Sequence, residues 1–183
     1  MRSFVAIDFS SELKNEIVKL QSELRDIASG GRWKYIDNFH LTLKFLGEVE
    51  RPKVQEINKV LQEICTKTER FKLQIGNLGF FPGKGNMRVL WLKLDGELDK
   101  LRKLQAEIDS SLEKVGFERE RRPYVPHVTI GQDIVFNMDF EEIRKLAIDK
   151  KYSSISVESV CLFKSEQVMN KRIYTPVSEY KLI

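Results

Sequence analysis

The two histidines of this chain occur in the same four-residue pattern. His40-Leu41-Thr42-Leu43 and His127-Val128-Thr129-Ile130 both read histidine, aliphatic residue, threonine, aliphatic residue. The chain has five threonines among 183 residues. Chance would therefore place a threonine two residues after a given histidine only roughly 3% of the time. The repetition indicates that the two histidines and the two threonines work together.

Two histidines and two hydroxyls suit acid–base chemistry on an anionic substrate. Histidine is the side chain whose ordinary pKa allows it to give or take a proton near neutral pH. A neutral imidazole can take a proton from water while a protonated one gives a proton to a leaving oxygen. Threonine hydroxyls can donate hydrogen bonds to phosphoryl oxygens as negative charge grows there. The set predicts hydrolysis of a phosphodiester, and a cyclic phosphodiester fits well.

Other reaction classes lack their residues. No Gly-x-Ser-x-Gly sequence provides the nucleophile of a serine hydrolase. The glycine-rich segment 79–85 departs from a phosphate-binding P-loop at Leu78 and Gly85. Two histidines with the isolated Cys65 and Cys161 do not have the spacing of a zinc site, so we expect no metal and no cofactor. The simplest alternative is that both histidines are ordinary half-buried strand residues.

The composition predicts a globular chain with an anionic partner. Apolar residues make up 42% of the chain and include 11 phenylalanines, which is enough for a core. No run of about 18 apolar residues is present, and the N-terminus is charged too early for a signal peptide, so we expect a cytoplasmic protein without a membrane segment. Cys65 and Cys161 are then buried free thiols or a disulfide. The net charge of +4 leans modestly towards an anion.

The apolar spacing places both motifs on β-strands. Alternate residues of a strand share a face, so His40 and Thr42 would project together while the aliphatic residues between them face a core. Helices are expected from Ser10 to Gly30, from Pro52 to Ile64, and over 98–115 and 140–148. Strands are expected at 3–8, 32–36, 40–49, 70–78, 87–94, from 127 onward, 151–163 and 171–182.

The two motifs are 127 − 40 = 87 residues apart, close to half the chain. Each motif strand is followed by a helix and then by a pair of strands. Helices mixed with tight hairpins favour the α+β class with antiparallel sheets. The repetition predicts a duplicated lobe, and pseudo-two-fold symmetry would place the two histidines on opposite walls of one cleft.

Several stretches carry a resemblance to a known family. They are His40-Leu41-Thr42-Leu43-Lys44-Phe45-Leu46-Gly47-Glu48, Leu78-Gly79-Phe80-Phe81-Pro82 with Arg88-Val89-Leu90-Trp91, Pro126-His127-Val128-Thr129-Ile130, and Leu162-Phe163-Lys164-Ser165 with Tyr174. Together they resemble the two-histidine phosphoesterases, and among these the bacterial and archaeal RNA 2′,3′-cyclic phosphodiesterases, also called 2′-5′ RNA ligases. The resemblance covers nearly the whole chain.

The resemblance implies a bilobal, duplicated α+β fold with two antiparallel sheets facing a central groove and helices on the outside. Residues 1–183 would be a single catalytic domain of two pseudo-symmetric lobes. The implied activity is metal-independent hydrolysis of RNA 2′,3′-cyclic phosphate ends to 2′-phosphomonoesters. His40 would be the proton donor to the leaving 3′-oxygen and His127 the proton acceptor that activates water, while Thr42 and Thr129 hold the phosphate. The expected partner is RNA with a 2′,3′-cyclic phosphate end, tRNA halves among them, and the chain is expected to be a monomer.

Gln132 departs from the family pattern, because family members often carry an arginine five residues after the second histidine. Lys44, Arg88 or Arg122 would have to replace that charge, and strict alternation puts Lys44 on the face of His40. The departure motivates an alternative function, an RNA-end-binding module with little or no turnover. The same residues also suit the reverse reaction, 2′-5′ RNA ligation.

Two further features have alternative interpretations. The loop Arg119–Arg122 either meets RNA phosphates at the rim of the cleft or is a solvated basic loop. The aromatic residues Phe45, Phe80, Phe81 and Trp91 are candidates for stacking a base. For Phe45, strict alternation favours the core, opposite His40.

Overall fold

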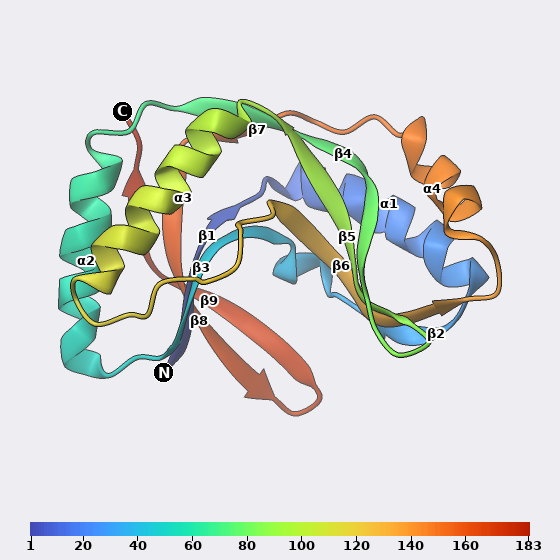
Figure 1. Cartoon of the computed structure of the whole chain (residues 1–183), viewed down its shortest axis with the longest axis horizontal. Helices are drawn as coiled ribbons and strands as arrows, with labels where there is room; N and C mark the ends of the chain where they lie inside the picture. The colour runs from blue at the N-terminus through green and yellow to red at the C-terminus, as the bar shows by residue number, and fades with distance from the viewer.

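The computed structural model describes all 183 residues as two antiparallel β-sheets with two helices outside each (Figure 1). Sheet 1 has the strand order β3 (His40–Glu48), β1 (Arg2–Asp8), β8 (Ser159–Val168), β9 (Lys171–Lys181). Sheet 2 has the order β2 (Ala28–Trp33), β6 (His127–Phe136), β5 (Met87–Gly96), β4 (Phe71–Pro82), β7 (Ile155–Val157). This confirms the predicted α+β class with antiparallel sheets and outer helices.

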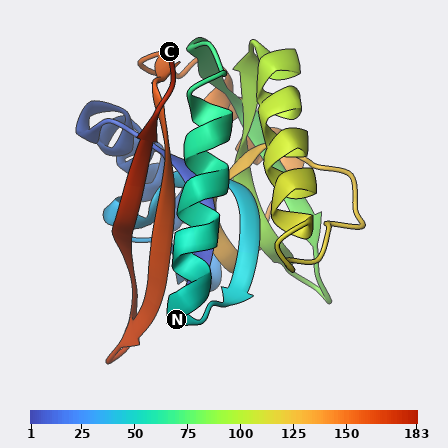
Figure 2. The same ribbon diagram turned by 90° about the vertical axis from the view of Figure 1, so that its left-hand side faces the viewer.

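Four helices cover the outer faces of the sheets. Helices α2 (Arg51–Cys65) and α3 (Leu98–Glu113) lie side by side against sheet 1 (Figure 2). Helices α1 (Ser11–Ile27) and α4 (Phe140–Ile148) lie against sheet 2. Side chains cap α1 and α4, where Ser10 accepts from the Leu13 N–H and Asp139 from the Glu141 N–H. None of these helices has the length and apolar character needed to cross a membrane.

The chain crosses between the sheets, so each motif and the hairpin that follows it lie in different sheets. β3 belongs to sheet 1 and hairpin β4–β5 to sheet 2, whereas β6 belongs to sheet 2 and hairpin β8–β9 to sheet 1. Residues 151–163, predicted as one strand, contain β7 in sheet 2 and the start of β8 in sheet 1. Strand β2 also begins earlier than predicted, because α1 ends at Ile27. The two sheets share one hydrophobic core of 37 buried residues.

Both motif strands contain a β-bulge at the same place. In the pairing of β3 with β1, Leu43 is left without a partner, because Thr42 and Lys44 oppose consecutive residues. In the pairing of β6 with β5, Ile130 is left out in the same way. Each unpaired residue is the third after its histidine. A bulge shifts the alternation of side chains by one residue, so the fifth residue after each histidine returns to the histidine's face.

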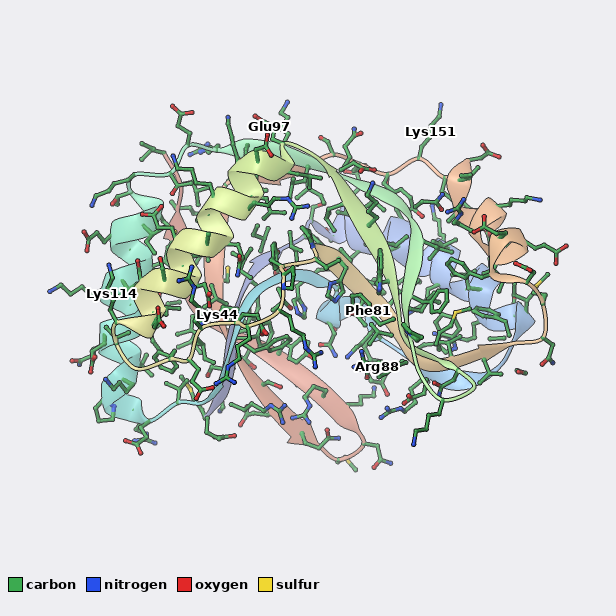
Figure 3. The ribbon with its side chains drawn as sticks, in the orientation of Figure 1. Lys44, Phe81, Arg88, Glu97, Lys114 and Lys151 are labelled. Atoms are coloured by element: carbon green, nitrogen blue, oxygen red, sulfur yellow. The ribbon has the colours of Figure 1, made fainter.

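The bulge at Leu43 makes two predictions from strict alternation wrong. Phe45, predicted in the core, is 73% exposed. Lys44, predicted to share the face of His40, points inward and has a side chain only 3% exposed (Figure 3). Its ammonium group donates to the Asp109 carboxylate on α3 and to the Glu118 carbonyl. Lys44 is therefore a structural cation that ties β3 to α3, and it does not replace a missing phosphate contact.

The buried pair of Lys44 and Asp109 gives a prediction on stability. Asp109→Ala leaves the ammonium group buried without its counter-ion, so we expect the free energy of unfolding to fall by about 3–5 kcal/mol in urea titrations. The double variant Lys44→Met/Asp109→Leu removes both charges and should be clearly more stable than Asp109→Ala. Glu107→Ala on the exposed side of α3 is the control. An Asp109→Ala protein as stable as this control would contradict the role of the pair.

Candidate active site

Each motif histidine begins its strand and is oriented by a backbone carbonyl two residues earlier. His40 Nδ1–H donates to the Asn38 carbonyl oxygen at 2.8 Å, and His127 Nδ1–H donates to the Val125 carbonyl oxygen at 2.7 Å. A carbonyl oxygen only accepts, so Nδ1 carries the proton of each neutral ring and Nε2 is left as the acceptor. The two histidines therefore present the same nitrogen for chemistry.

The threonines share the faces of their histidines. The Thr42 hydroxyl donates to His40 Nε2 at 2.9 Å. Thr129 lies two residues after His127 on the same face of β6 and opposes Trp91 of β5. A threonine therefore shares the face of each histidine, and on β3 its hydroxyl is hydrogen-bonded to the imidazole.

Tyr124 links the two motifs and was missed by the sequence reasoning. Its hydroxyl donates to the Thr42 carbonyl oxygen at 2.9 Å, which fastens the loop before β6 to β3. The flanking Pro123 and Pro126 were the available signal, because two prolines restrict the loop that carries the tyrosine. The strand of the first motif is thus held by the loop that leads into the second.

Aromatic rings surround His40. The ring centroid of Phe4 is 4.8 Å from that of the imidazole, and Tyr174 meets it edge-on at 5.2 Å. Phe163 lies farther away at 6.4 Å. These rings come from β1, β8 and β9, so all of sheet 1 contributes to the surroundings of His40.

His127 has an equivalent aromatic setting in sheet 2. Phe81 meets its ring edge-on at 5.2 Å, and the Trp91 ring lies at 6.0 Å. Gly79 makes this possible, because a Cβ at that position would come within 2.2 Å of the Trp91 indole. The glycine of the Leu78–Pro82 stretch therefore lets the indole lie across the backbone of β4.

Burial lowers the pKa of both histidines, since an apolar setting disfavours the imidazolium. For His40, desolvation brings the pKa to about 4, against an opposing contribution from the Asn38 carbonyl and with a further lowering by the Lys34 charge. For His127, desolvation also lowers the pKa, and the Val125 carbonyl opposes it. Both rings are therefore neutral near pH 7 in the free protein.

A groove of about 890 Å³ reaches both motifs, because Thr42 and His127 both line it. Its rings include Phe45, Phe81 and Tyr124. Its arginines are Arg88, Arg119, Arg121 and Arg122, and the buried Lys44, which is paired with Asp109, also lines it. Figure 3 shows Arg88 near Phe81 on the β4–β5 hairpin. The arginine-rich loop thus lies at the groove, as one of its two interpretations predicted.

Gln132 lies on the same face as His127, because the bulge at Ile130 restores it to that side. It opposes Val89 and brings no charge to the groove. Arg119 pairs with Asp109, whereas Arg88 and Arg122 form no ion pair. Two of the three cations predicted to replace the missing arginine therefore remain available, and Lys44 does not.

Comparison with known proteins finds the same family throughout the chain. A family model described as the 2′-5′ RNA ligase superfamily matches residues 9–168. A protein of Methanocaldococcus jannaschii named RNA 2′,3′-cyclic phosphodiesterase is 33% identical, over 98% of this chain and 100% of its own. A Thermotoga maritima protein with the same name is 34% identical, over 84% of this chain and 87% of its own. The similarity therefore includes both motifs.

Solved structures agree with the sequence comparisons. The crystal structure of Escherichia coli LigT complexed with 3′-AMP superposes with a TM-score of 0.82 at 25% identity, over 99% of this chain and 97% of that one. A Thermus thermophilus protein, TT0787, shares the fold with a TM-score of 0.80 at 21% identity, over 100% of this chain and 98% of that one.

The low pKa of His40 makes the stability of the protein depend on pH. The folded-state value of about 4 is below the ordinary value of about 6.5, so protons bind preferentially to the unfolded chain. The resulting stability is present above pH 6.5 and is lost as the pH falls towards 4. We expect the free energy of unfolding, measured by urea titration, to fall between pH 7 and pH 4.5 by about 2 kcal/mol less in His40→Gln than in the wild type. Parallel pH curves for the two proteins would contradict the burial of a neutral His40.

Proposed function

The chain belongs to the 2′-5′ RNA ligase superfamily, and we propose that it is an RNA 2′,3′-cyclic phosphodiesterase that forms 2′-phosphomonoesters with its two histidines. The observation that carries the proposal is the matched pair of motifs, of which Thr42 and His127 line one groove. Each imidazole is held by Nδ1 and presents Nε2 on the face of its strand that carries a threonine. Residues 1–183 act as a single catalytic domain of two pseudo-symmetric lobes.

The chemistry follows from the two Nε2 atoms. Neutral His127 takes a proton from water as the water oxygen forms a bond to phosphorus. Protonated His40 gives its Nε2 proton to the 3′-oxygen as the bond between phosphorus and that oxygen breaks. The phosphate stays on the 2′-oxygen. Thr42 and Thr129 donate hydrogen bonds to the non-bridging oxygens, on which negative charge grows. No step in this scheme uses a metal ion.

His40 must gain a proton to act as the acid, and the charge of the bound substrate favours that protonation. In the free protein its pKa of about 4 keeps the ring neutral near pH 7. An anionic phosphate beside the ring favours the imidazolium and raises this pKa. The Thr42 hydroxyl, which donates to Nε2 in the free protein, is then released to donate to a phosphoryl oxygen.

The groove fits an RNA end. Arg88, Arg121 and Arg122 supply positive charge for phosphates, and the exposed ring of Phe45 offers a face for a base. We include tRNA halves that carry a cyclic phosphate among the substrates. Because one chain supplies both motifs and the groove, we propose that the protein acts as a monomer. We also propose that it acts in the cytoplasm. The same groups run 2′-5′ ligation when the 5′-hydroxyl of a second RNA takes the place of water.

A hydrolysis assay tests the function directly. We expect the wild type to convert a short RNA ending in 2′,3′-cyclic phosphate to the 2′-phosphate in the presence of EDTA, as followed by chromatography. His40→Ala and His127→Ala should each lower kcat by about 100- to 10,000-fold, the usual contribution of a general acid or base. Circular dichroism checks that both variants fold.

Normal turnover by either folded variant would refute the two-histidine mechanism. Tight binding of the RNA by the wild type without product over hours would instead indicate an RNA-end-binding module. Gln132→Arg, which restores the charge that family members often carry, would then be the next variant to assay.

The pH dependence of turnover provides a separate prediction. In the free protein, one ring must be protonated and the other neutral, and both pKa values are lowered. Both limbs of the kcat/KM profile should therefore lie below about pH 6.5. The kcat profile should extend to higher pH, because bound phosphate raises the pKa of His40. Stopped assays from pH 4 to 9 measure both profiles, and coincident profiles would contradict this assignment.

A further inference from the structure

A second group of cations lies apart from the arginine-rich loop. Its members are Lys34, just after β2, and Arg172, near the start of β9. Figure 2 shows the loop that precedes β6 and the β8–β9 hairpin on opposite sides of β3, the strand that begins with His40. Neither Lys34 nor Arg172 lines the groove described above. Neither residue has a role in the mechanism proposed above.

The position of Arg172 is fixed relative to His40. The Asn38 side chain donates to the Arg172 carbonyl oxygen at 2.7 Å, and the Asn38 carbonyl accepts from His40 Nδ1. Arg172 lies two residues before Tyr174 on β9, so the two side chains share a face. The Tyr174 ring meets the His40 ring at 5.2 Å. Arg172 therefore belongs to the face of sheet 1 that carries the imidazole.

Lys34 is also held by the strand of the second motif. Its backbone N–H donates to the Ile130 carbonyl oxygen at 3.0 Å. Its carbonyl accepts from the buried Gln21 side chain of α1 at 2.7 Å. The ammonium group of Lys171 lies 4.9 Å from the ring centroid of Tyr35, which brings the start of β9 against this segment. The segment that carries Lys34 is thus in contact with the start of β9, and the charge of Arg172 acts on Lys34.

These two cations have no carboxylate partner. Both side chains are half-buried, and neither forms an ion pair, although Asp8 pairs with Lys14 and Asp133 with Arg32. Burial, followed by the charges of Arg32 and Arg172, lowers the pKa of Lys34. Like charges that are partly removed from water and left without a counter-ion are unfavourable, and a bound anion relieves both costs.

We propose that Lys34 and Arg172 form a second phosphate subsite, which takes the 5′-phosphate of the nucleotide whose cyclic phosphate lies between the two histidines. This inference rests on the proposed function and specifies its substrate as a polynucleotide end in preference to a free nucleoside cyclic phosphate. The 5′-phosphate is the anion nearest to the reacting end of an RNA. Asn38 contacts both the Arg172 backbone and the His40 ring, so the subsite lies beside the imidazole.

The subsite also connects binding to catalysis. Burial is the main cause of the lowered pKa of His40, and the positive charge of Lys34 lowers it further, whereas the Asp8 carboxylate opposite His40 on β1, which is paired with Lys14, raises it. A phosphate on Lys34 and Arg172 compensates the Lys34 charge, so occupation of the subsite favours the protonated form of His40 that donates to the leaving oxygen. A substrate with a 5′-phosphate should therefore bind better and react faster.

Two small substrates separate this subsite from the reaction itself. One is adenosine 2′,3′-cyclic phosphate with a 5′-hydroxyl, and the other carries a 5′-phosphate in addition. We expect the wild type to have at least a tenfold higher kcat/KM for the 5′-phosphorylated compound. In Lys34→Met/Arg172→Met, the kcat/KM values for the two compounds should differ by no more than twofold. Because the ratio is taken within one protein, a general effect on His40 cancels.

Lys114→Met/Lys151→Met is the matched control, since it removes the same charge at two exposed positions far from the groove (Figure 3). It should keep the wild-type ratio. Should the double subsite variant not fold, Lys34→Gln alone tests the same ratio. A wild-type ratio near one, or a ratio unchanged in the subsite variant, overturns the subsite while hydrolysis itself stands. No hydrolysis of either compound or of cyclic-phosphate RNA by the wild type overturns the proposed function together with this inference.

Discussion

The bond from each histidine's Nδ1 to the carbonyl two residues earlier is the constraint on which the site depends. It fixes the tautomer and leaves Nε2 as the only nitrogen available to a substrate. The two carbonyls are available because Asn38 and Val125 precede the strands, where no neighbouring strand uses their oxygens. The short helix η1 (Ile36–Asn38) provides one carbonyl and a proline-flanked loop provides the other. Two unlike local structures thus produce the same imidazole geometry.

The matching bulges extend this equivalence beyond the motifs. Leu43 and Ile130 are each the third residue after a histidine, both are buried, and both are left out of the ladder. Two independent strands have little reason to share a bulge at one position, so we attribute it to the pseudo-symmetric lobes proposed above. The bulges return Phe45 and Gln132 to the histidine faces. The equivalent positions thus carry an aromatic ring on one wall and an amide on the other, and neither carries a charge.

Local patterns in the sequence were sufficient for most of the elements and for placing both motifs on strands. The strands of both motifs, the four helices and a hairpin turn between β4 and β5 were predictable, because each depends on the spacing of neighbouring residues. The turn was expected to begin at Phe81, but β4 continues to Pro82. The orientations of Lys44 and Phe45 were not, because a bulge is set by the pairing with β1. The crossing of hairpins between sheets and the approach of Lys34 to Arg172 depend on tertiary packing between residues far apart in the chain. Cys65 and Cys161, left open as free or paired, are both free and buried.

The distribution of charge explains how an apolar site can handle a phosphate. A cation next to a histidine would lower the imidazole pKa further, and a carboxylate there would repel the substrate. The motif strands themselves place neither type of group on the histidine faces after the bulges. Of the nearby charges, Asp8 opposite His40 is paired with Lys14, and Lys44 is compensated by Asp109 inside the core. Positive charge is held instead at the periphery, on the loop before β6 on one side and on Lys34 and Arg172 on the other. The free site therefore stays desolvated with both rings neutral, and in the mechanism proposed above the negative charge that converts His40 into an acid arrives with the substrate. Proton donation is thereby restricted to the complex in which a phosphate is present to be cleaved.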